Sequence, residues 1–298
     1  MEGVRPLNVF RRIGVYLEMV KVAHTVFALP FALTGMFLAA REMGARNALP
    51  PPRTVFYIVL AMVGARSAAM GFNRLVDAGF DATNPRTANR ELPAGRMTRR
   101  EAILFVAAFS VAFVICAWAL GPICLALSPV ALLIVFWYSL AKRFTWSTQA
   151  FLGLAMAVAP VGGWLAAGGR GGWEPWLLAV AIATWVGGFD VLYACQDLEC
   201  DIAHGLKSIP QRFGVERALT ISRVAHVVTI LCLASLPLVV PALGVVYLLG
   251  VGSVALLLAF EQALVSARDL SRVKMAFDLN GYVGILYFLM TAAAMYVH

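Results

Sequence analysis

The stretch WEPWLLAVAIATWVGGFDVLYACQDLECD, residues 173–201, joins an apolar run to a cluster of acidic residues. The run is long enough to cross a bilayer as a helix, which takes about 20 largely apolar residues. The acidic residues at its end are Asp190, Asp197, Glu199 and Asp201. Carboxylates at the edge of hydrocarbon are costly unless they bind a ligand, so their placement indicates a functional site at the end of a membrane span.

A second acidic cluster has the same setting. Residues 73–81 read NRLVDAGFD and follow another apolar run. With about 100° of rotation per residue, Asn73, Asp77 and Asp81 share one face of a helix with Arg66. Gly79 and Pro85 predict that this helix breaks soon after Asp77, which makes Asp81 the less certain member of the cluster.

Helical phase also separates the residues of the first-quoted cluster. Asp190, Asp197 and Asp201 fall within about 40° of one another if the helix continues through them. Glu199 lies nine residues after Asp190 and points almost the opposite way. We therefore expect Glu199 to face away from the site that the three aspartates share.

The composition predicts an all-α membrane protein of nine transmembrane helices. Apolar residues make up 61% of the 298 residues, and the mean hydropathy is +0.81, which excludes an ordinary soluble domain. The bilayer interior leaves unpaired backbone groups without partners, so the spans must be helical. The predicted spans are 19–40, 54–72, 99–119, 121–141, 148–168, 173–195, 217–239, 241–265 and 277–297.

These spans form a single domain over residues 1–298. The acidic clusters follow the second and sixth spans, which suggests a pseudo-repeat of 19–141 and 148–265 plus a ninth helix at 277–297. A parallel repeat of this kind places two equivalent loops face to face around one central cavity. The segments that carry the clusters are then expected to cap that cavity.

The charge distribution orients the chain. Nineteen of the 24 lysines and arginines fall in the N-terminal segment and the loops on its side of the membrane. This positive-inside asymmetry predicts a multi-pass protein of the cell membrane with a cytoplasmic N-terminus and both acidic clusters at the cytoplasmic face. The net charge of +8 therefore reflects membrane topology, and we expect no nucleic-acid partner.

Oxygen ligands and nearby cations predict a site for Mg²⁺ and a phosphorylated ligand. Mg²⁺ prefers carboxylate and amide oxygens and often shares them with substrate phosphates. The candidate metal ligands are Asn73, Asp77, Asp81, Asp197 and Asp201. Basic side chains at the same mouth suit phosphate oxygens, and the candidates are Lys21, Arg86, Arg90 and Lys207. The alternative is that these charges pair with one another or with lipid headgroups.

Three further residues have two possible interpretations. Tyr138 and Lys142 are spaced i,i+4 at the end of the fourth span, which on spacing alone is typical of an interfacial tyrosine and a lysine that reaches the headgroups. Arg66 lies about two turns inside its span, where an unpaired guanidinium is expensive. It either pairs with a carboxylate for structure or faces an anion in the cavity.

These motifs resemble those of the UbiA superfamily of intramembrane prenyltransferases. Residues 73–81 resemble the first aspartate motif of the family, and residues 190–201 with Gly-Leu-Lys-Ser at 205–208 resemble the second. Residues 86–95, RTANRELPAG, resemble the loop Arg-Thr-x-x-Arg-Pro-Leu-Pro. Tyr138 and Lys142 are similar to the family's Tyr-x-x-x-Lys element. Two residues depart from the pattern: Glu91 replaces the usual Pro of the loop, and Arg74 stands where many members have Asp.

The resemblance implies transfer of a polyprenyl chain from its diphosphate to an aromatic acid, with Mg²⁺, in quinone biosynthesis. The motif sequences most resemble those of the branch that uses 4-hydroxybenzoate. A relative that acts on a dihydroxynaphthoate would have nearly the same motifs. The resemblance implies catalytic roles for Asp77, Asp190, Asp197, Tyr138, Lys142 and Arg66. Asn73 and Lys142 are also expected to bind substrate, together with the four basic residues named above. A polyprenyl diphosphate, an aromatic acid and membrane lipid are thus the expected partners. The alternative from another class is a secondary transporter, which would favour polar sites near the bilayer midplane.

Overall fold

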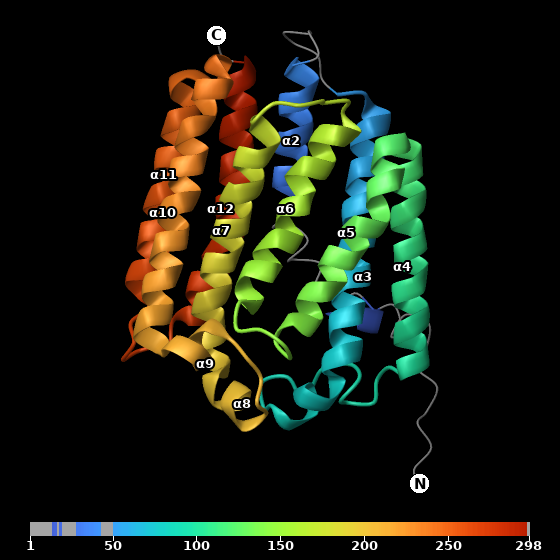
Figure 1. Ribbon diagram of the computed structural model, residues 1–298, viewed down its shortest axis with the longest axis vertical. Helices are drawn as coiled ribbons and strands as arrows, with labels where there is room; N and C mark the ends of the chain where they lie inside the picture. The colour runs from blue at the N-terminus through green and yellow to red at the C-terminus, as the bar shows by residue number, and fades with distance from the viewer. Residues whose placement is uncertain (1–13, 17, 20–27, 43–49, 297–298) are drawn as a thin grey trace.

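The computed structural model describes residues 14–16, 18–19, 28–42 and 50–296, and this part of the chain is a bundle of helices without a β-strand (Figure 1). The long helices are α2 (Leu29–Glu42), α3 (Pro52–Thr83), α4 (Arg99–Leu120), α5 (Pro122–Ala141), α6 (Thr148–Ala166), α7 (Glu174–Ala194), α10 (Val215–Val239), α11 (Gly244–Leu264) and α12 (Val273–Tyr296). The short elements are the 3₁₀ turns η2 (Cys195–Asp197) and η3 (Pro241–Leu243) and the helices α8 (Leu198–Ala203) and α9 (Ile209–Phe213).

The all-α membrane fold predicted from the sequence is confirmed. Eight helices in the described part of the chain are long and apolar enough to cross a membrane. They match the second to ninth predicted spans. The first predicted span, 19–40, lies partly outside the described residues, and α2 covers its second half inside the bundle (Figure 1).

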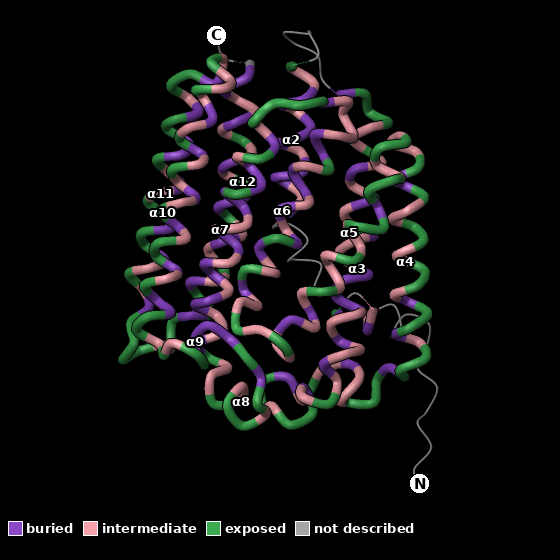
Figure 2. The backbone as a smooth tube through the Cα atoms, in the orientation of Figure 1, coloured by how far each residue is buried: buried purple, intermediate pink, exposed green. Residues whose placement is uncertain are grey.

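Burial follows the demands of a lipid environment. Large apolar side chains such as Leu104 and Trp118 on α4 and Leu133 on α5 are exposed, and Figure 2 shows many exposed positions along both helices. The interior holds closely packed aromatic residues, among them Trp164 and Trp185 at 1% exposure. Lipid tails are as apolar as these outer residues, so the outward faces need no protein partner.

Small residues let the central helices approach closely. A side chain at Gly163 of α6 would collide with the backbone of Ala32 on α2, and one at Gly35 of α2 would collide with the backbone of Pro160. Small residues at helix contacts are the usual means of tight packing in membranes. This contact sets α6 against α2 on one side of the bundle interior.

The helix that carries the first acidic cluster is longer than predicted. The expected break after Asp77 is wrong, because α3 continues through Gly79 to Thr83. Asn84 then adopts an extended conformation, as the residue before a proline prefers, and Pro85 follows. Asp81 is therefore helical and stays on the same face as Asp77.

The second acidic cluster spans a change of helix type. α7 ends at Ala194, and the 3₁₀ turn η2 connects it to the short helix α8. Asp190 thus lies on the spanning helix, Asp197 in the turn and Asp201 on α8. In Figure 1, α8 lies at the same end of the bundle as the C-terminal end of α3 and the segment that follows it.

Candidate active site

A polar cavity of about 290 Å³ lies between the two acidic clusters. Its walls come from α3, α5, α6, α7, η2, α8 and α12 and from the segments that follow α3, α5 and α8. The acidic and amide side chains that line it are Asn73, Asp77, Asp81, Asn84, Gln149, Asp190, Asp197 and Asp201. The structure therefore brings both predicted clusters to one cavity, although more than 100 residues separate them in the sequence.

Asp77 is the centre of the first cluster. Its carboxylate is nearly buried and lies 3.0 Å from Lys142 Nζ and 2.8 Å from Arg143 Nη2. Asn73 Nδ2 donates to it at 3.1 Å. Arg143 is held in turn by the carbonyl oxygens of Ser139 and Val76, each at 2.8 Å. The C-terminal end of α5 is thus fastened to α3 by opposite charges.

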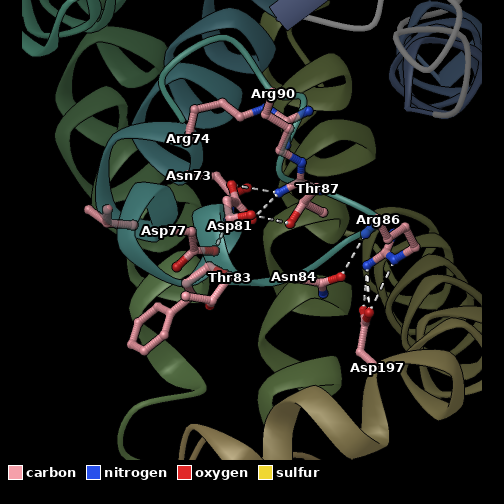
Figure 3. A network of polar contacts seen from close by, with 12 residues as sticks. Asn73, Arg74, Asp77, Asp81, Thr83, Asn84, Arg86, Thr87, Arg90 and Asp197 are labelled. Carbon is pink, nitrogen blue, oxygen red and sulfur yellow. Dashed lines mark hydrogen bonds and ion pairs between the residues drawn. The ribbon is translucent and has the colours of Figure 1, made fainter. Parts of the chain in front are cut away.

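Asp81 pairs with the loop that follows α3. Arg90 Nη1 donates to both of its carboxylate oxygens, at 2.7 and 2.8 Å (Figure 3). The Thr87 hydroxyl donates to the Asp81 carbonyl at 3.1 Å. These bonds fold the loop back over the end of α3. As a result, the predicted basic residue Arg90 lies at the mouth of the cavity.

Arg86 connects the two clusters across the cavity. Its guanidinium donates to the Asp197 carboxylate at 2.6, 2.7 and 3.1 Å (Figure 3) and to the Tyr193 hydroxyl at 2.6 Å. Burial would lower the pKa of Arg86, but the opposing charge of Asp197 leaves that pKa above its ordinary value. Arg86 therefore stays a cation that bridges the two halves of the bundle.

The remaining acidic residues differ in their surroundings. Ser208 Oγ donates to Asp201 at 2.8 Å. Asp190 lines the cavity, and no hydrogen bond or ion pair holds its carboxylate in the part of the chain that the structure describes. Glu199 is exposed and is not among the described residues that line the cavity. The phase argument does not account for this, because η2 interrupts the helix between Asp190 and Glu199.

A second cavity of about 360 Å³ adjoins the polar one and is almost entirely apolar. Arg66, Tyr138, Leu152 and Met156 line both cavities. Arg66 Nε is buried without a hydrogen-bond partner, and no ion pair of Arg66 occurs among the described residues. A guanidinium at this depth, without a protein counterion, faces an anion more readily than a structural partner.

Two predicted basic residues have other outcomes. Lys207 lines the polar cavity, but its Nζ donates to the Phe144 carbonyl at 3.2 Å. Its backbone N–H donates to the Lys142 carbonyl at 2.8 Å. Lys207 thus ties the segment after α8 to the end of α5. The predicted Lys21 lies outside the described residues.

The donors around the cavity fit a hard divalent cation in kind. Carboxylates and amides are the groups that Mg²⁺ prefers, and residues of α3, α6, α7, η2 and α8 supply such oxygens at the cavity. Within the described residues, however, no three acidic, histidine or cysteine side chains are gathered closely enough to hold one metal ion. Asp77, Asp81 and Asp197 are instead paired with cations.

Sequence reasoning missed three residues of this site: Arg143, Tyr193 and Ser208. Arg143 directly follows Lys142, so the sequence shows a cation at this place. Its contact with Asp77 depends on how the end of α5 packs against α3, which the sequence does not show. Tyr193 lies three residues after Asp190, nearly one helical turn, which is the signal that could have found it. Ser208 is the N-cap of α9. A serine before a short helix is typical of a cap, so its type and position did not indicate a hydrogen bond to Asp201.

Sequence comparisons identify relatives over most of the chain. The model of the UbiA prenyltransferase family matches residues 28–292. A 4-hydroxybenzoate octaprenyltransferase of Vibrio campbellii is 31% identical over 244 residues, which cover 81% of this chain and 84% of that protein. The protein of the same name from Aliivibrio fischeri is 30% identical over 263 residues, or 88% of each chain.

Solved structures share the arrangement of helices. The apo structure of a UbiA homolog from Aeropyrum pernix K1 superimposes with a TM-score of 0.81 at 33% identity and covers 91% of this chain and 98% of its own. A UbiA homolog from Archaeoglobus fulgidus bound to GPP and Mg²⁺ has the same fold, with a TM-score of 0.70 at 20% identity over 95% of this chain and 100% of its own. On the family match, the relatives and the shared architecture, this chain belongs to the UbiA prenyltransferase family.

Proposed function

We propose that this enzyme transfers a polyprenyl chain from its diphosphate to an aromatic acid such as 4-hydroxybenzoate, in quinone biosynthesis. The observation that carries the choice of acceptor is Arg66, a guanidinium at the meeting of the polar and apolar cavities that has no counterion among the described residues. A dihydroxynaphthoate-type acid is the second candidate, because it offers the same carboxylate on an electron-rich ring.

The position of Arg66 fits the carboxylate of such an acceptor. Arg66 precedes Asp77 by eleven residues on α3, or about 16 Å along the helix axis. A diphosphate that is held by the cations at the mouth would leave Arg66 too deep for its oxygens. An aromatic acid beside Tyr138 would place its carboxylate at Arg66 and its ring next to the reacting carbon of the donor.

The cations of the mouth suit the diphosphate of the donor. Arg86, Arg90 and Lys142 lie around the polar cavity and can bind the phosphate oxygens in the bound state. Asn73 and the aspartates of both clusters would hold Mg²⁺, which when bound withdraws charge from the leaving diphosphate. The Archaeoglobus fulgidus homolog, which is bound to GPP and Mg²⁺, supports a prenyl diphosphate and a divalent metal as the ligands of this site.

The two cavities suit the two ends of the donor, and the reaction would take place where they meet. The allylic C–O bond breaks, and the electron pair leaves with the diphosphate. The apolar cavity holds the isoprenoid chain and keeps water from the allylic cation. A ring carbon of the acceptor forms the new C–C bond, and loss of its proton restores aromaticity. Asp190 lines the cavity without an ion pair among the described residues and would accept that proton.

We further propose that the enzyme resides in the cell membrane with the polar cavity open to the cytoplasm. The support is the positive-inside distribution, in which nineteen of 24 lysines and arginines lie on the side of the acidic clusters. The donor and the product, both with long apolar tails, would enter and leave through the lipid. Membership of a prenyltransferase family decides against the transporter alternative.

The test is an assay of the purified protein in lipid vesicles with several prenyl diphosphates. Each donor is combined with 4-hydroxybenzoate, with 1,4-dihydroxy-2-naphthoate, and with the same rings lacking the carboxylate. We expect Mg²⁺-dependent release of diphosphate and a prenylated product with one of the two acids. Equal turnover of the rings without a carboxylate would contradict the role of Arg66, and the absence of any prenylated aromatic acid would overturn the proposed function.

A further inference from the structure

Arg74 and Glu91, the two residues that depart from the family's motifs, meet in the structure. Arg74 Nε lies 3.7 Å from Glu91 Oε2, and the two side chains are only 3% and 6% exposed. Arg74 lies on α3 directly after Asn73, and Glu91 directly follows Arg90 in the segment between α3 and α4. Two departures that look unrelated in the sequence therefore form one buried pair of opposite charges.

Arg74 and Glu91 attract each other by charge, without a hydrogen bond between the two facing atoms. Neither Arg74 Nε nor Glu91 Oε2 has a hydrogen-bond partner in the described part of the chain. Arg96 Nη2 approaches Glu91 Oε1 to 4.0 Å, but its nearer partner is Glu18, at 2.6 Å. A buried ion pair of this kind contributes little net stability, whereas loss of one partner leaves an uncompensated buried charge. We therefore look for the role of the ion pair in the position of the backbone segment that carries Glu91.

Glu91 is a fixed point of the segment that carries the basic residues of the mouth. Its carbonyl accepts hydrogen bonds from the backbone N–H groups of Arg96 at 2.9 Å and Met97 at 3.1 Å. The preceding residue, Arg90, extends its guanidinium to Asp81. Holding Glu91 against α3 therefore holds the backbone from which Arg90 reaches the cavity.

Arg74 lies near a second cation, Arg90, and the charge of Glu91 offsets the repulsion between them. Arg74 and Arg90 are close enough to repel each other, and Glu91 and Asp81 are the nearby carboxylates that offset them. If Glu91 lost its charge, Arg74 would remain as a buried cation beside Arg90. The least costly response is a shift of the segment, which would move Arg90 away from Asp81.

We propose that Arg74 and Glu91 are positioning residues that set the segment 84–98, and with it Arg90, for the diphosphate of the donor. The proposal rests on the proposed function for its kinetic readout only. Arg74 also lines the polar cavity, so direct contact with the diphosphate is the rival role that the experiment must separate.

The experiment is a double-mutant cycle with Arg74→Gln, Glu91→Gln and the combination of both. Each single variant leaves one buried charge unpaired, and the double variant removes both charges. We expect each single variant to raise the KM for the prenyl diphosphate about tenfold with a smaller change in kcat, and the double variant to return to within about threefold of the parent. Trypsin should cleave the segment 84–98 faster in the single variants than in the double variant, without any substrate present.

Arg100→Gln is the matched control, because Arg100 is an exposed arginine at the start of α4. It removes the trypsin site at residue 100 itself, but it should leave KM and the rate of cleavage after Arg86, Arg90 and Arg96 unchanged. A raised KM in Arg74→Gln alone, with no recovery in the double variant, would show direct contact and overturn the proposal. The proposal would also be overturned if the increase in KM of the double variant equalled the product of the two single increases, because the two residues would then act independently. Because trypsin cleavage needs no reaction, failure of the proposed function would leave that readout intact.

Discussion

Lys142 Nζ lies 3.0 Å from Asp77 Oδ2 and joins the end of α5 to the first acidic cluster. The sequence spacing of Tyr138 and Lys142 alone suggested two interfacial residues. The ion pair instead turns Lys142 toward the cavity, where its other neighbours include Asp190 and Asp201. A cation among three carboxylates is well placed to move to a diphosphate when the carboxylates take up a metal ion.

Substitution of the two central aspartates should abolish catalysis. We expect Asp77→Asn and Asp197→Asn to lower kcat by at least about 100-fold, the scale of removing a group that stabilises developing charge. Because Asp77 is buried against Lys142 and Arg143, its loss should also lower the melting temperature. Turnover by purified, folded protein is the measurement, and activity near the parent level in either variant would rule out a joint site.

Glu199 should matter less than Asp201. Glu199 is exposed, whereas Asp201 lines the polar cavity and is held by Ser208. We expect Glu199→Gln to keep most of the activity and Asp201→Asn to lose most of it. Measurement of kcat at several Mg²⁺ concentrations for both variants provides the comparison. The reverse order would mean that the end of α8 is rearranged in the working enzyme.

Lys142→Met should weaken use of the donor without changing the metal requirement. One charge-assisted hydrogen bond contributes about 1.5–3 kcal/mol, so we expect a loss of roughly 10- to 150-fold in kcat/KM for the prenyl diphosphate. Tyr138→Phe should cost less, because the Tyr138 hydroxyl is neutral and a neutral group contributes less to binding an anion than a cation does. An unchanged kcat/KM in folded Lys142→Met would return this residue to the role of an interface anchor.

Arg66→Leu should affect the acceptor and spare the donor. We expect the KM for the aromatic acid to rise about 10- to 100-fold, with the KM for the prenyl diphosphate within about twofold, because in the proposed function Arg66 pairs with the acceptor carboxylate and not with the diphosphate. The methyl ester of 4-hydroxybenzoate is the matched probe. The parent enzyme should prefer the acid to the ester, and Arg66→Leu should lose that preference; a preserved preference would contradict the assignment.

The sequence by itself determined the membrane fold and the chemical character of the site. Hydropathy located the eight spans that the described residues contain, although α3 extends beyond its predicted end. It could do so because a bilayer requires a certain length and an apolar composition, and both can be read from one sequence. Helical phase placed Asp77 with Asp81, because side-chain direction on a continuous helix depends only on local spacing. It could not place Glu199 relative to Asp190, because η2 interrupts the helix between them. The pseudo-repeat stays a prediction.

The tertiary structure decided which charges meet. Nothing local pairs Arg143 with Asp77, Arg86 with Asp197, or Arg74 with Glu91, since these contacts depend on how distant helices and loops pack. It also carried α3 to Thr83, because hydrogen bonding and packing at the helix end outweighed the weak preference of Gly79 for a break. Sequence supplies the charges and the faces that carry them, whereas the pairing of buried charges is fixed only when packing excludes water and leaves each charge with the partners within its reach.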